Sequence, residues 1–455
     1  MNNLNKRVKY KETCDGKRFS TISRKGMVKR LLLIQQKVLC SIAMLFLCLT
    51  LHAQRNEIFS EQIRSLRVLV DNNWTLSPIV TLGARQHIEI SFDDLTHEYH
   101  RYVYRVEHCD ALWQPSTDLL QSDYLSGINE DTPIEGYKQS LNTTQLYTHY
   151  SLRIPNENMG LLLSGNYRVT VLLEDENNKI TPVLTAHFSV VEQCVSIRAS
   201  VSTNTDRDWN DHLQQLEMAL SYGSLAVRDA RQEMKTIVLQ NNRWDIAVIN
   251  APASYITTSG LQWTHNKALI FDAGNEYRKF ELLSLHYAGM GIDHLKWFPP
   301  YYHATLLLDK PRCNYVYDEE QNGNYFIRTS DNSENDTQSD YVYVHFSLQA
   351  EARLDGDFYL NGEWTRDLFL PEYKMHYNAD KKVYEASILM KQGYYNYQYL
   401  FVPSSDPTRG FTKQAEGNFY QTENKYSIFI YYRPTGSRYD RLVGYRTIEF
   451  NPNRP

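Results

Sequence analysis

The sequence lacks the short signatures of the best-known catalytic and nucleotide-binding sites. It contains no GxSxG, GxxxxGK[ST], GxGxxG or HExxH pattern. These absences remove the serine-hydrolase elbow, the phosphate-binding loop, the dinucleotide fingerprint and the zinc-protease helix. The absences do not exclude an enzyme, but they remove these specific routes to catalysis, and no cofactor or small-molecule substrate is predicted.

Cysteine is also scarce, and half of it lies near the start of the chain. Of six cysteines, three fall within the first 53 residues, and the others are Cys109, Cys194 and Cys313. An odd, widely spaced set without a CxxC pair is neither a disulfide framework nor a zinc site. Buried free thiols, or one bridge with one free thiol, both remain open.

Basic residues are outnumbered after residue 53. Residues 54–455 carry 37 Lys and Arg against 51 Asp and Glu, a formal charge of −14. Nucleic-acid binding requires clustered positive charge to neutralise phosphates. No nucleic-acid partner is therefore expected.

Only one long apolar run is present, and it is typical of a secretory signal. Residues 38–51 (VLCSIAMLFLCLTL) follow a basic stretch that begins at Met27, and Ala53 offers a small residue before a cleavage point. The run is short for a membrane span and ends in polar residues. We predict that residues 1–53 are a cleavable signal peptide with an upstream extension, that Met27 is the true start, and that the mature protein is exported.

Short strands dominate residues 54–193. Apolar and polar side chains alternate along residues 88–93 and 102–107, and turn residues such as Asp93-Asp94 separate about seven runs of this kind. The pattern predicts an immunoglobulin-like β-sandwich over residues 54–193.

Residues 194–329 are predicted to form a middle sandwich, although one of its strands has the composition of a helix. Residues 214–222 contain good helix formers, yet Leu216, Met218 and Leu220 alternate with polar or small residues. A period of two indicates a strand. Residues 297–302 (WFPPYY) are predicted to be a stiff surface loop, with a recognition groove as the alternative.

A polar segment separates this region from the end of the chain. Residues 330–340 contain no apolar residue and are predicted to be a linker. Residues 341–455 would form a third sandwich, closed by a hairpin of two aromatic, β-branched runs, 394–402 and 425–432. The predicted fold is all-β, with three tandem β-sandwiches of the immunoglobulin-like or early-set-like kind.

Candidate metal ligands and carboxylate pairs have simpler explanations. Residues 97–100 (HEYH) and 108–110 (HCD) lie in and after a predicted turn, without the spacing of zinc ligands, so no metal site is predicted. The acidic pairs Asp93/Asp94, Glu319/Glu320 and Asp355/Asp357 lie at predicted strand ends, where turns favour Asp. They do not indicate a glycosidase pair.

Trp364 offers an alternative function for the third sandwich. With Phe358, Asn361 and the aromatic run 394–401 it resembles the starch- and glycogen-binding type of sandwich module. In such modules exposed aromatic rings stack on sugars. Aromatic side chains also pack protein cores, and stacking requires an exposure that sequence cannot show. An exported glycan-binding protein that uses Trp364 is thus the alternative hypothesis.

Tyrosine and arginine gather after the last predicted strand. Both residue types are enriched at protein interfaces, although rim charges that merely close a domain contribute little. We therefore identify six residues as a candidate partner-binding surface: Tyr431, Tyr432, Arg433, Arg438, Tyr439 and Arg441.

Short motifs with unusual residue combinations are distributed along the chain. They are SFDDL (91–95), YVYR (102–105), HCD (108–110), YTHY (147–150), SGNY (164–167), FDAGNEYR (271–278), NGNY (322–325), KQGYYNYQY (391–399) and the segment from EGNFY (416–420) to Tyr445. Together they resemble the plug protein family of the bacterial type IX secretion system. The resemblance spans residues 56–448.

This resemblance implies a non-enzymatic component of an outer-membrane protein-export machine. The protein would lie in the periplasm, associate peripherally with the outer membrane and bind the machine's β-barrel translocon. It would close the periplasmic end of that barrel when no substrate carrier is engaged. An all-β protein can block a pore by its shape alone, and docking on a barrel would cover its sheet edges.

Overall fold

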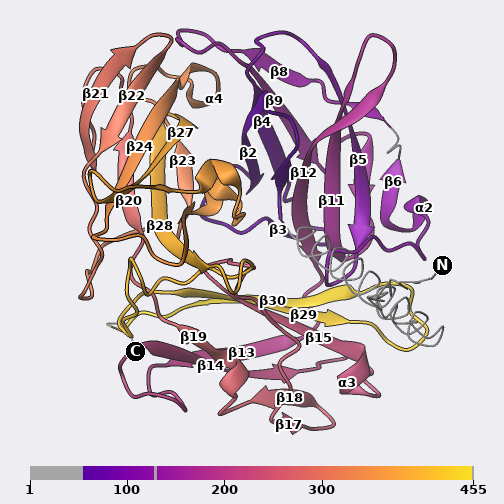
Figure 1. Ribbon diagram of the computed structural model, residues 1–455. Coiled ribbons are helices and arrows are strands. Elements are labelled where there is room, and N and C mark those ends of the chain that lie inside the picture. The colour runs from indigo at the N-terminus through magenta and orange to yellow at the C-terminus, as the bar shows by residue number, and fades with distance from the viewer. Residues whose placement is uncertain (1–54, 128–130, 453–455) are drawn as a thin grey trace, which may run out of the picture. The chain divides into compact units, whose positions relative to one another are not determined.

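The computed structural model describes residues 55–127 and 131–452. Almost all of their regular structure is β-strand, arranged in several open sheets (Figure 1). The predicted all-β sandwich class is therefore confirmed, whereas the predicted signal peptide lies outside the described residues. Within those residues, no helix has the length and apolar character needed to cross a membrane.

The first sandwich is built from strands between residues 57 and 191. One sheet has the order β1-β12-β11-β5-β7, with β3 beside β12, and the other has the order β2-β4-β9-β8. Its strands are β1 (Glu57–Ile58), β2 (Ile63–Val70), β3 (Ile79–Thr81), β4 (Ile88–Asp94), β5 (Arg101–Cys109), β7 (Thr132–Pro133), β8 (Gly136–Gln139), β9 (Thr148–Ile154), β11 (Gly165–Glu174) and β12 (Ile180–Val191). A ribbon of β6 (Leu125–Gly127) and β10 (Met159–Leu161) and the one-turn helix α2 (Gln121–Tyr124) complete it.

The middle sandwich combines strands from two distant parts of the chain. Its sheets have the orders β13-β14-β18-β17, with β19 beside β14, and β16-β15-β29-β30. Its elements are β13 (Ser196–Ser202), β14 (Leu213–Ser221), α3 (Ala230–Glu233), β15 (Met234–Gln240), β16 (Val248–Ile249), β17 (Tyr255–Ile256), β18 (Gly260–Trp263), η1 (Lys267–Leu269), β19 (Ile270–Asp272), β29 (Lys425–Tyr432) and β30 (Arg441–Glu449). Strand β14 confirms the prediction made from alternation, since Leu216, Met218 and Leu220 are all buried in its core.

The third sandwich contains the remaining strands. Its sheets have the orders β20-β28-β23, with β25 beside β28, and β21-β22-β24-β27-β26. Its elements are β20 (Arg278–Leu282), β21 (Ile292–Phe298), β22 (Tyr301–Leu306), β23 (Tyr325–Ile327), α4 (Asn335–Gln338), β24 (Tyr341–Gln349), β25 (Gly356–Asn361), η2 (Glu363–Thr365), η3 (Pro371–Tyr373), β26 (His376–Asn378), β27 (Val383–Lys391) and β28 (Gly393–Pro403).

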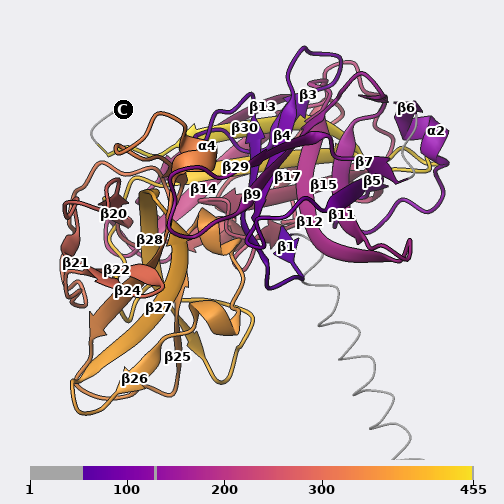
Figure 2. The ribbon, with the colours of Figure 1, turned by 90° about the horizontal axis from the view of Figure 1, so that it is seen from above.

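The predicted closing hairpin is wrong. Strand β28 pairs with β20, β23 and β25, whereas β29 pairs with β15 and β30, with Phe429 opposite Ile237. Figures 1 and 2 both show the yellow strands β29 and β30 beside β15 of the middle sandwich. Composition identifies a strand, but the identity of its partner depends on the tertiary fold.

Two further segments differ from expectation. Residues 330–340 do not separate two sandwiches, because β20–β23 before them and β24–β28 after them share the same two sheets. Residues 297–302 form the tip of the β21–β22 hairpin, where only Pro299 and Pro300 make the turn. In place of the predicted boundaries after residue 193, we propose a middle sandwich of residues 194–273 and 419–450, interrupted by a third sandwich of residues 274–418.

The three cysteines of the described chain are free. Cys109 is buried, Cys194 is half-buried and Cys313 is exposed. Of the two predicted alternatives, the structure has the one with free thiols and not the one with a disulfide bridge.

Candidate functional site

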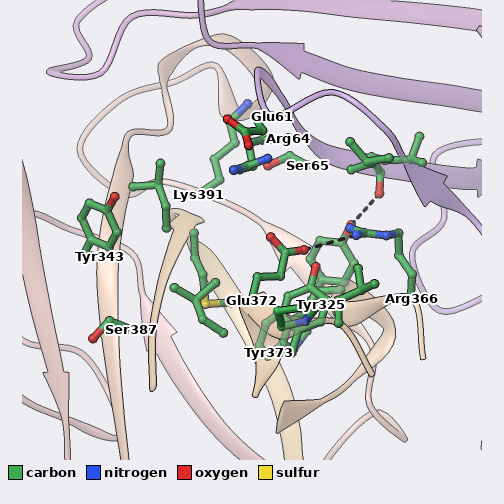
Figure 3. Close-up of a pocket in the computed structure, with 18 of the residues that line it drawn as sticks. Glu61, Arg64, Ser65, Tyr325, Tyr343, Arg366, Glu372, Tyr373, Ser387 and Lys391 are labelled. Carbon is green, nitrogen blue, oxygen red and sulfur yellow. Dashed lines mark hydrogen bonds and ion pairs between the residues drawn. The ribbon is translucent and has the colours of Figure 1, made fainter. Parts of the chain in front are cut away.

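A cavity of about 660 Å³ opens between the first and third sandwiches. Residues 58–66, which lead into β2, line one side, and residues 387–391 of β27 line another. Trp364 of η2 and Tyr373 of η3 also line it. Figure 3 shows Tyr373 beside Tyr325 and Glu372. Its volume lies within the usual range of ligand-binding clefts, roughly 300–1,000 Å³.

A buried ion pair joins the two sandwiches next to this cavity. The ammonium of Lys391, at the end of β27, lies 2.6 Å from the carboxylate of Asp93, at the end of β4, and neither side chain is accessible to solvent. Asp93 also accepts a hydrogen bond of 2.7 Å from the Tyr341 hydroxyl and lies 2.6 Å from Nδ1 of His149. Three groups therefore surround one carboxylate.

The surroundings of Asp93 keep it ionised. Burial alone would raise its pKa, but the charge of Lys391 and the hydrogen bond with His149 lower the pKa to about 2. A buried carboxylate is tolerated only when it is paired and hydrogen-bonded. The loss of one partner would leave an uncompensated charge, which makes this junction sensitive to substitution.

Neighbouring groups extend the junction toward α4. The Lys391 ammonium lies 4.2 Å from the centre of the Tyr147 ring, a cation–π contact. The Tyr147 hydroxyl donates to the carbonyl of Ser339 at 2.8 Å, and Asp340 accepts from the Thr144 and Gln145 backbone N–H groups at 2.6 and 3.0 Å. The segment predicted to be a linker thus helps to fix the first sandwich to the third.

Sequence reasoning missed this junction because it assigned Asp93 and Asp94 to a turn. Both residues instead end strand β4 and are fully buried. Asp94 accepts from the Tyr102 hydroxyl at 2.9 Å and lies 2.7 Å from Nδ1 of His100. The sequence did contain one signal of this junction: two carboxylates directly follow the alternating apolar residues of β4.

Two of the three histidines considered as metal ligands, His100 and His108, have other partners. His100 pairs with Asp94, while Nδ1 of His108 lies 2.9 Å from the Ser116 hydroxyl. Among residues 55–127 and 131–452, no group of three or more His, Cys, Asp or Glu side chains is arranged to hold a metal ion.

Of the six residues predicted to bind a partner, Tyr432 belongs to the core of the middle sandwich, and the other five lie where that sandwich meets the first. Tyr431 is 1% exposed and donates to Oδ1 of Asn166 at 2.9 Å, from β29 to β11. Arg441 makes two hydrogen bonds, of 2.7 and 2.8 Å, to the carboxylate of Glu192. Tyr432 is buried and donates to the carbonyl of Ala226. These three residues hold the fold together and present little surface to another protein.

The other three members of that set lie nearer to solvent. Arg438 is exposed, and its guanidinium lies 2.9 Å from Asp123. Arg433 is half-buried, and Tyr439 packs edge-on against His108, with 5.4 Å between ring centres. Only this rim of the predicted surface is accessible, and a partner-binding role for it stays a prediction.

Trp364, for which sugar stacking was the alternative to core packing, belongs mainly to the core of the third sandwich. It is 9% exposed, its indole N–H donates to the carbonyl of Asn396 at 2.9 Å, and its ring stacks on Phe346 with 6.1 Å between centres. Tyr373 packs edge-on against it. The small exposed part contributes to the cavity, but no open ring face is presented to a sugar.

Residues of the short motifs converge on the junctions between sandwiches. Asp93, His149 and Lys391 form the first junction, and Asn166 belongs to the second. The motif residues Arg278 and Glu416 instead pair within the third sandwich, where the buried Glu416 accepts from Nε of Arg278 at 3.0 Å. Several motif residues therefore help to fix the sandwiches to one another.

Two comparisons with known proteins identify relatives. Residues 63–192, which make up most of the first sandwich, match the family model described as Type 9 secretion system plug protein 1st domain. A crystal structure of a hypothetical protein from Parabacteroides merdae is 42% identical, with a TM-score of 0.83; the match covers 87% of this chain and 100% of that chain. No curated protein matches the chain.

Proposed function

Because this chain belongs to the type IX secretion system plug protein family, we propose that it closes the periplasmic end of the system's outer-membrane β-barrel translocon. The match over residues 63–192 is the observation that carries this proposal. The protein would act without catalysis, as a peripheral component that is exported by its signal peptide. Its docking surface would belong to the exposed rims of the sandwiches.

The buried junctions support a role as a stopper. A protein that blocks a pore must keep its shape under load, and ion pairs with a fixed geometry restrain the sandwiches against sliding. Asp93–Lys391 links the first sandwich to the third, and Arg441–Glu192 links it to the middle one. Domains joined only by flexible linkers would move independently by default.

Glycan binding is not favoured as the function. It would require Trp364 to offer its ring face to a sugar, and that ring is covered by Phe346 on one side and approached by Tyr373 at its edge. We therefore retain the plug role alone.

Co-purification and permeability together test the proposal. Tagged protein from gently solubilised envelopes is expected to carry the barrel translocon with it. Deletion of the gene is expected to admit large antibiotics that the outer membrane normally excludes, and further deletion of the barrel should restore exclusion. Recovery of the protein only as a free monomer, or leakage that persists without the barrel, would contradict the proposal.

A further inference from the structure

Strand β27 has one edge that is only partly paired. Along its whole length it pairs with β24, but β26 covers the other edge only at residues 383–385. The backbone N–H of Ala350 bonds to the carbonyl of Lys382, and that of Gln392 bonds to the carbonyl of Asp340. Even-numbered residues of β27 therefore point their backbone groups at β24, and odd-numbered residues point theirs at the opposite edge.

Ser387 and Leu389 consequently present unpaired backbone groups to the cavity. Both residues line it, Ser387 is exposed and Leu389 is half-buried. Within residues 55–127 and 131–452, no group bonds to their outward N–H or C=O. An open strand edge with alternating donors and acceptors is a template for another strand.

We propose that this cavity binds an extended peptide segment of a partner protein, which adds as a strand to the open edge of β27. Only a polypeptide backbone repeats a donor and an acceptor at the spacing of Ser387 and Leu389, since residues two apart along a strand are about 6.6 Å apart. Sugars and lipids lack this repeat. Strand addition is a common mode of peptide recognition, in which backbone bonds supply affinity and side-chain pockets supply specificity.

The cavity lining indicates which side chains the peptide would carry. Phe59, which is 51% exposed, and the half-buried Leu370 and Leu389 offer apolar surface to alternate side chains of an added strand. Among the charged residues, Lys391 is neutralised by Asp93, and Arg366 lies 3.4 Å from Glu372 (Figure 3).

Two charged residues of the lining, Glu61 and Arg64, have no ion-pair partner within the described chain. Glu61 is exposed, whereas Arg64 is half-buried and its guanidinium donates to the carbonyl of Ile63 at 2.9 Å. Arg64 therefore faces the cavity as a free cation. Charge complementarity favours a peptide with a carboxylate, from Asp, Glu or a C-terminus, beside Arg64 and a basic side chain beside Glu61.

Hydrogen exchange of the free protein tests the open edge directly. In the full chain, the amides of Ser387 and Leu389 are expected to exchange about 100-fold faster than those of Ile388 and Met390, which bond to β24. Equal protection of all four amides would mean that the edge is already covered and would overturn the proposal.

Peptide selection tests the binding. A phage library of random dodecapeptides, selected on the full chain, is expected to yield apolar sequences that contain an acidic residue. The synthetic peptides should slow exchange at Ser387 and Leu389 by about tenfold or more. The substitution Ser387→Trp should abolish binding by filling the cavity, and Arg64→Glu should weaken it about tenfold.

Thr305→Trp is the matched control, because Thr305 lies on the same sheet two strands away and outside the cavity. Wild-type melting temperatures for all three variants would exclude misfolding. The proposal fails if no peptide binds, or if binding survives Ser387→Trp.

The same experiments would identify other occupants of the cavity. A dimer that Ser387→Trp dissociates would identify a second copy of the chain, and binding that appears only after removal of residues 1–53 would identify the chain's own segment. Either result overturns a partner peptide. These measurements use purified protein, so their failure leaves the proposed role in secretion untouched.

Discussion

Two parts of β27 have opposite character: its C-terminal end at Lys391, the closed end, and its middle at Ser387 and Leu389, the open edge. At one end Lys391 is enclosed, with its ammonium paired to Asp93. Four residues earlier, Ser387 is exposed, and its outward backbone groups have no partner among the described residues. The closed end fixes the strand, and the middle leaves its outer edge open. A fixed end also stabilises the open edge, because it prevents the strand from shifting its register.

Substitution of Lys391 should distinguish the closed end from the open edge most clearly. Lys391→Met leaves the Asp93 carboxylate buried beside Tyr341 and His149 without its ammonium, and we expect it to lower the free energy of unfolding by about 3–5 kcal/mol. Urea unfolding followed by tryptophan fluorescence would measure this. Lys381→Met is the control: its partner Glu385 forms an exposed pair, worth less than about 1 kcal/mol. Equal losses in both variants would contradict the distinction.

Removal of one hydroxyl at the closed end should have a smaller effect. Tyr341→Phe deletes the 2.7 Å bond to Asp93 and the 2.7 Å contact with the Ser65 hydroxyl, while the ring keeps its place beside Tyr147. Hydrogen bonds to charged groups contribute about 1.5–3 kcal/mol, and we expect a loss in that range from urea unfolding. In the background of Lys391→Met the same substitution should cost a different amount, because both groups contact one carboxylate. Additive losses would indicate that the two contacts are independent.

Acid should weaken the closed end specifically. The pKa of Asp93 falls from an ordinary 3.8 to about 2 in the folded protein. Its contribution is therefore complete above pH 4 and is lost as the pH falls through 2, a change of about 2 kcal/mol. The double variant Asp93→Asn/Lys391→Met lacks this pair, and its unfolding free energy should change less between pH 4 and pH 2. A parallel decline in both proteins would assign the acid sensitivity to other carboxylates.

Substitution at the open edge, in the middle of β27, should barely affect stability. Ser387→Trp adds a ring to an exposed position that lines the cavity, and we expect a change of no more than about 0.5 kcal/mol in unfolding free energy. Thermal melts of this variant and of Thr305→Trp should agree with the wild type. A large loss in Ser387→Trp alone would mean that the cavity wall is as tightly packed as the closed end.

Sequence reasoning predicted local structure well and long-range pairing poorly. The alternation of Leu216, Met218 and Leu220 identified β14 because burial of one sheet face leaves a direct trace in the order of residues. Nothing of that kind links Asp93 to Lys391, which are 298 positions apart. In the sequence alone, an ionisable residue at the end of a strand indicates a turn. Its role in an ion pair is visible only when the fold shows its partner.

For the candidate site, too, sequence reasoning identified local features and missed the long-range contacts. Trp364 was identified from its motif and does line the cavity, but its orientation depends on Phe346 and Tyr373, which only the fold brings together. The tyrosines at positions 431 and 432 looked available for a partner because composition cannot distinguish an internal interface from an external one. Both kinds of interface are rich in tyrosine and arginine.

The discontinuous middle sandwich sets an order of events during protein synthesis. Strand β15 receives its neighbour β29 only after the strands of the third sandwich have been made, because Phe429 lies 192 positions after its partner Ile237. The first and third sandwiches have all their strands earlier. The middle one closes last, when residue 449 has left the ribosome, and with it come the Tyr431 and Arg441 contacts to the first sandwich. A chain released too early would therefore lack a whole sandwich, although only its final strands are missing.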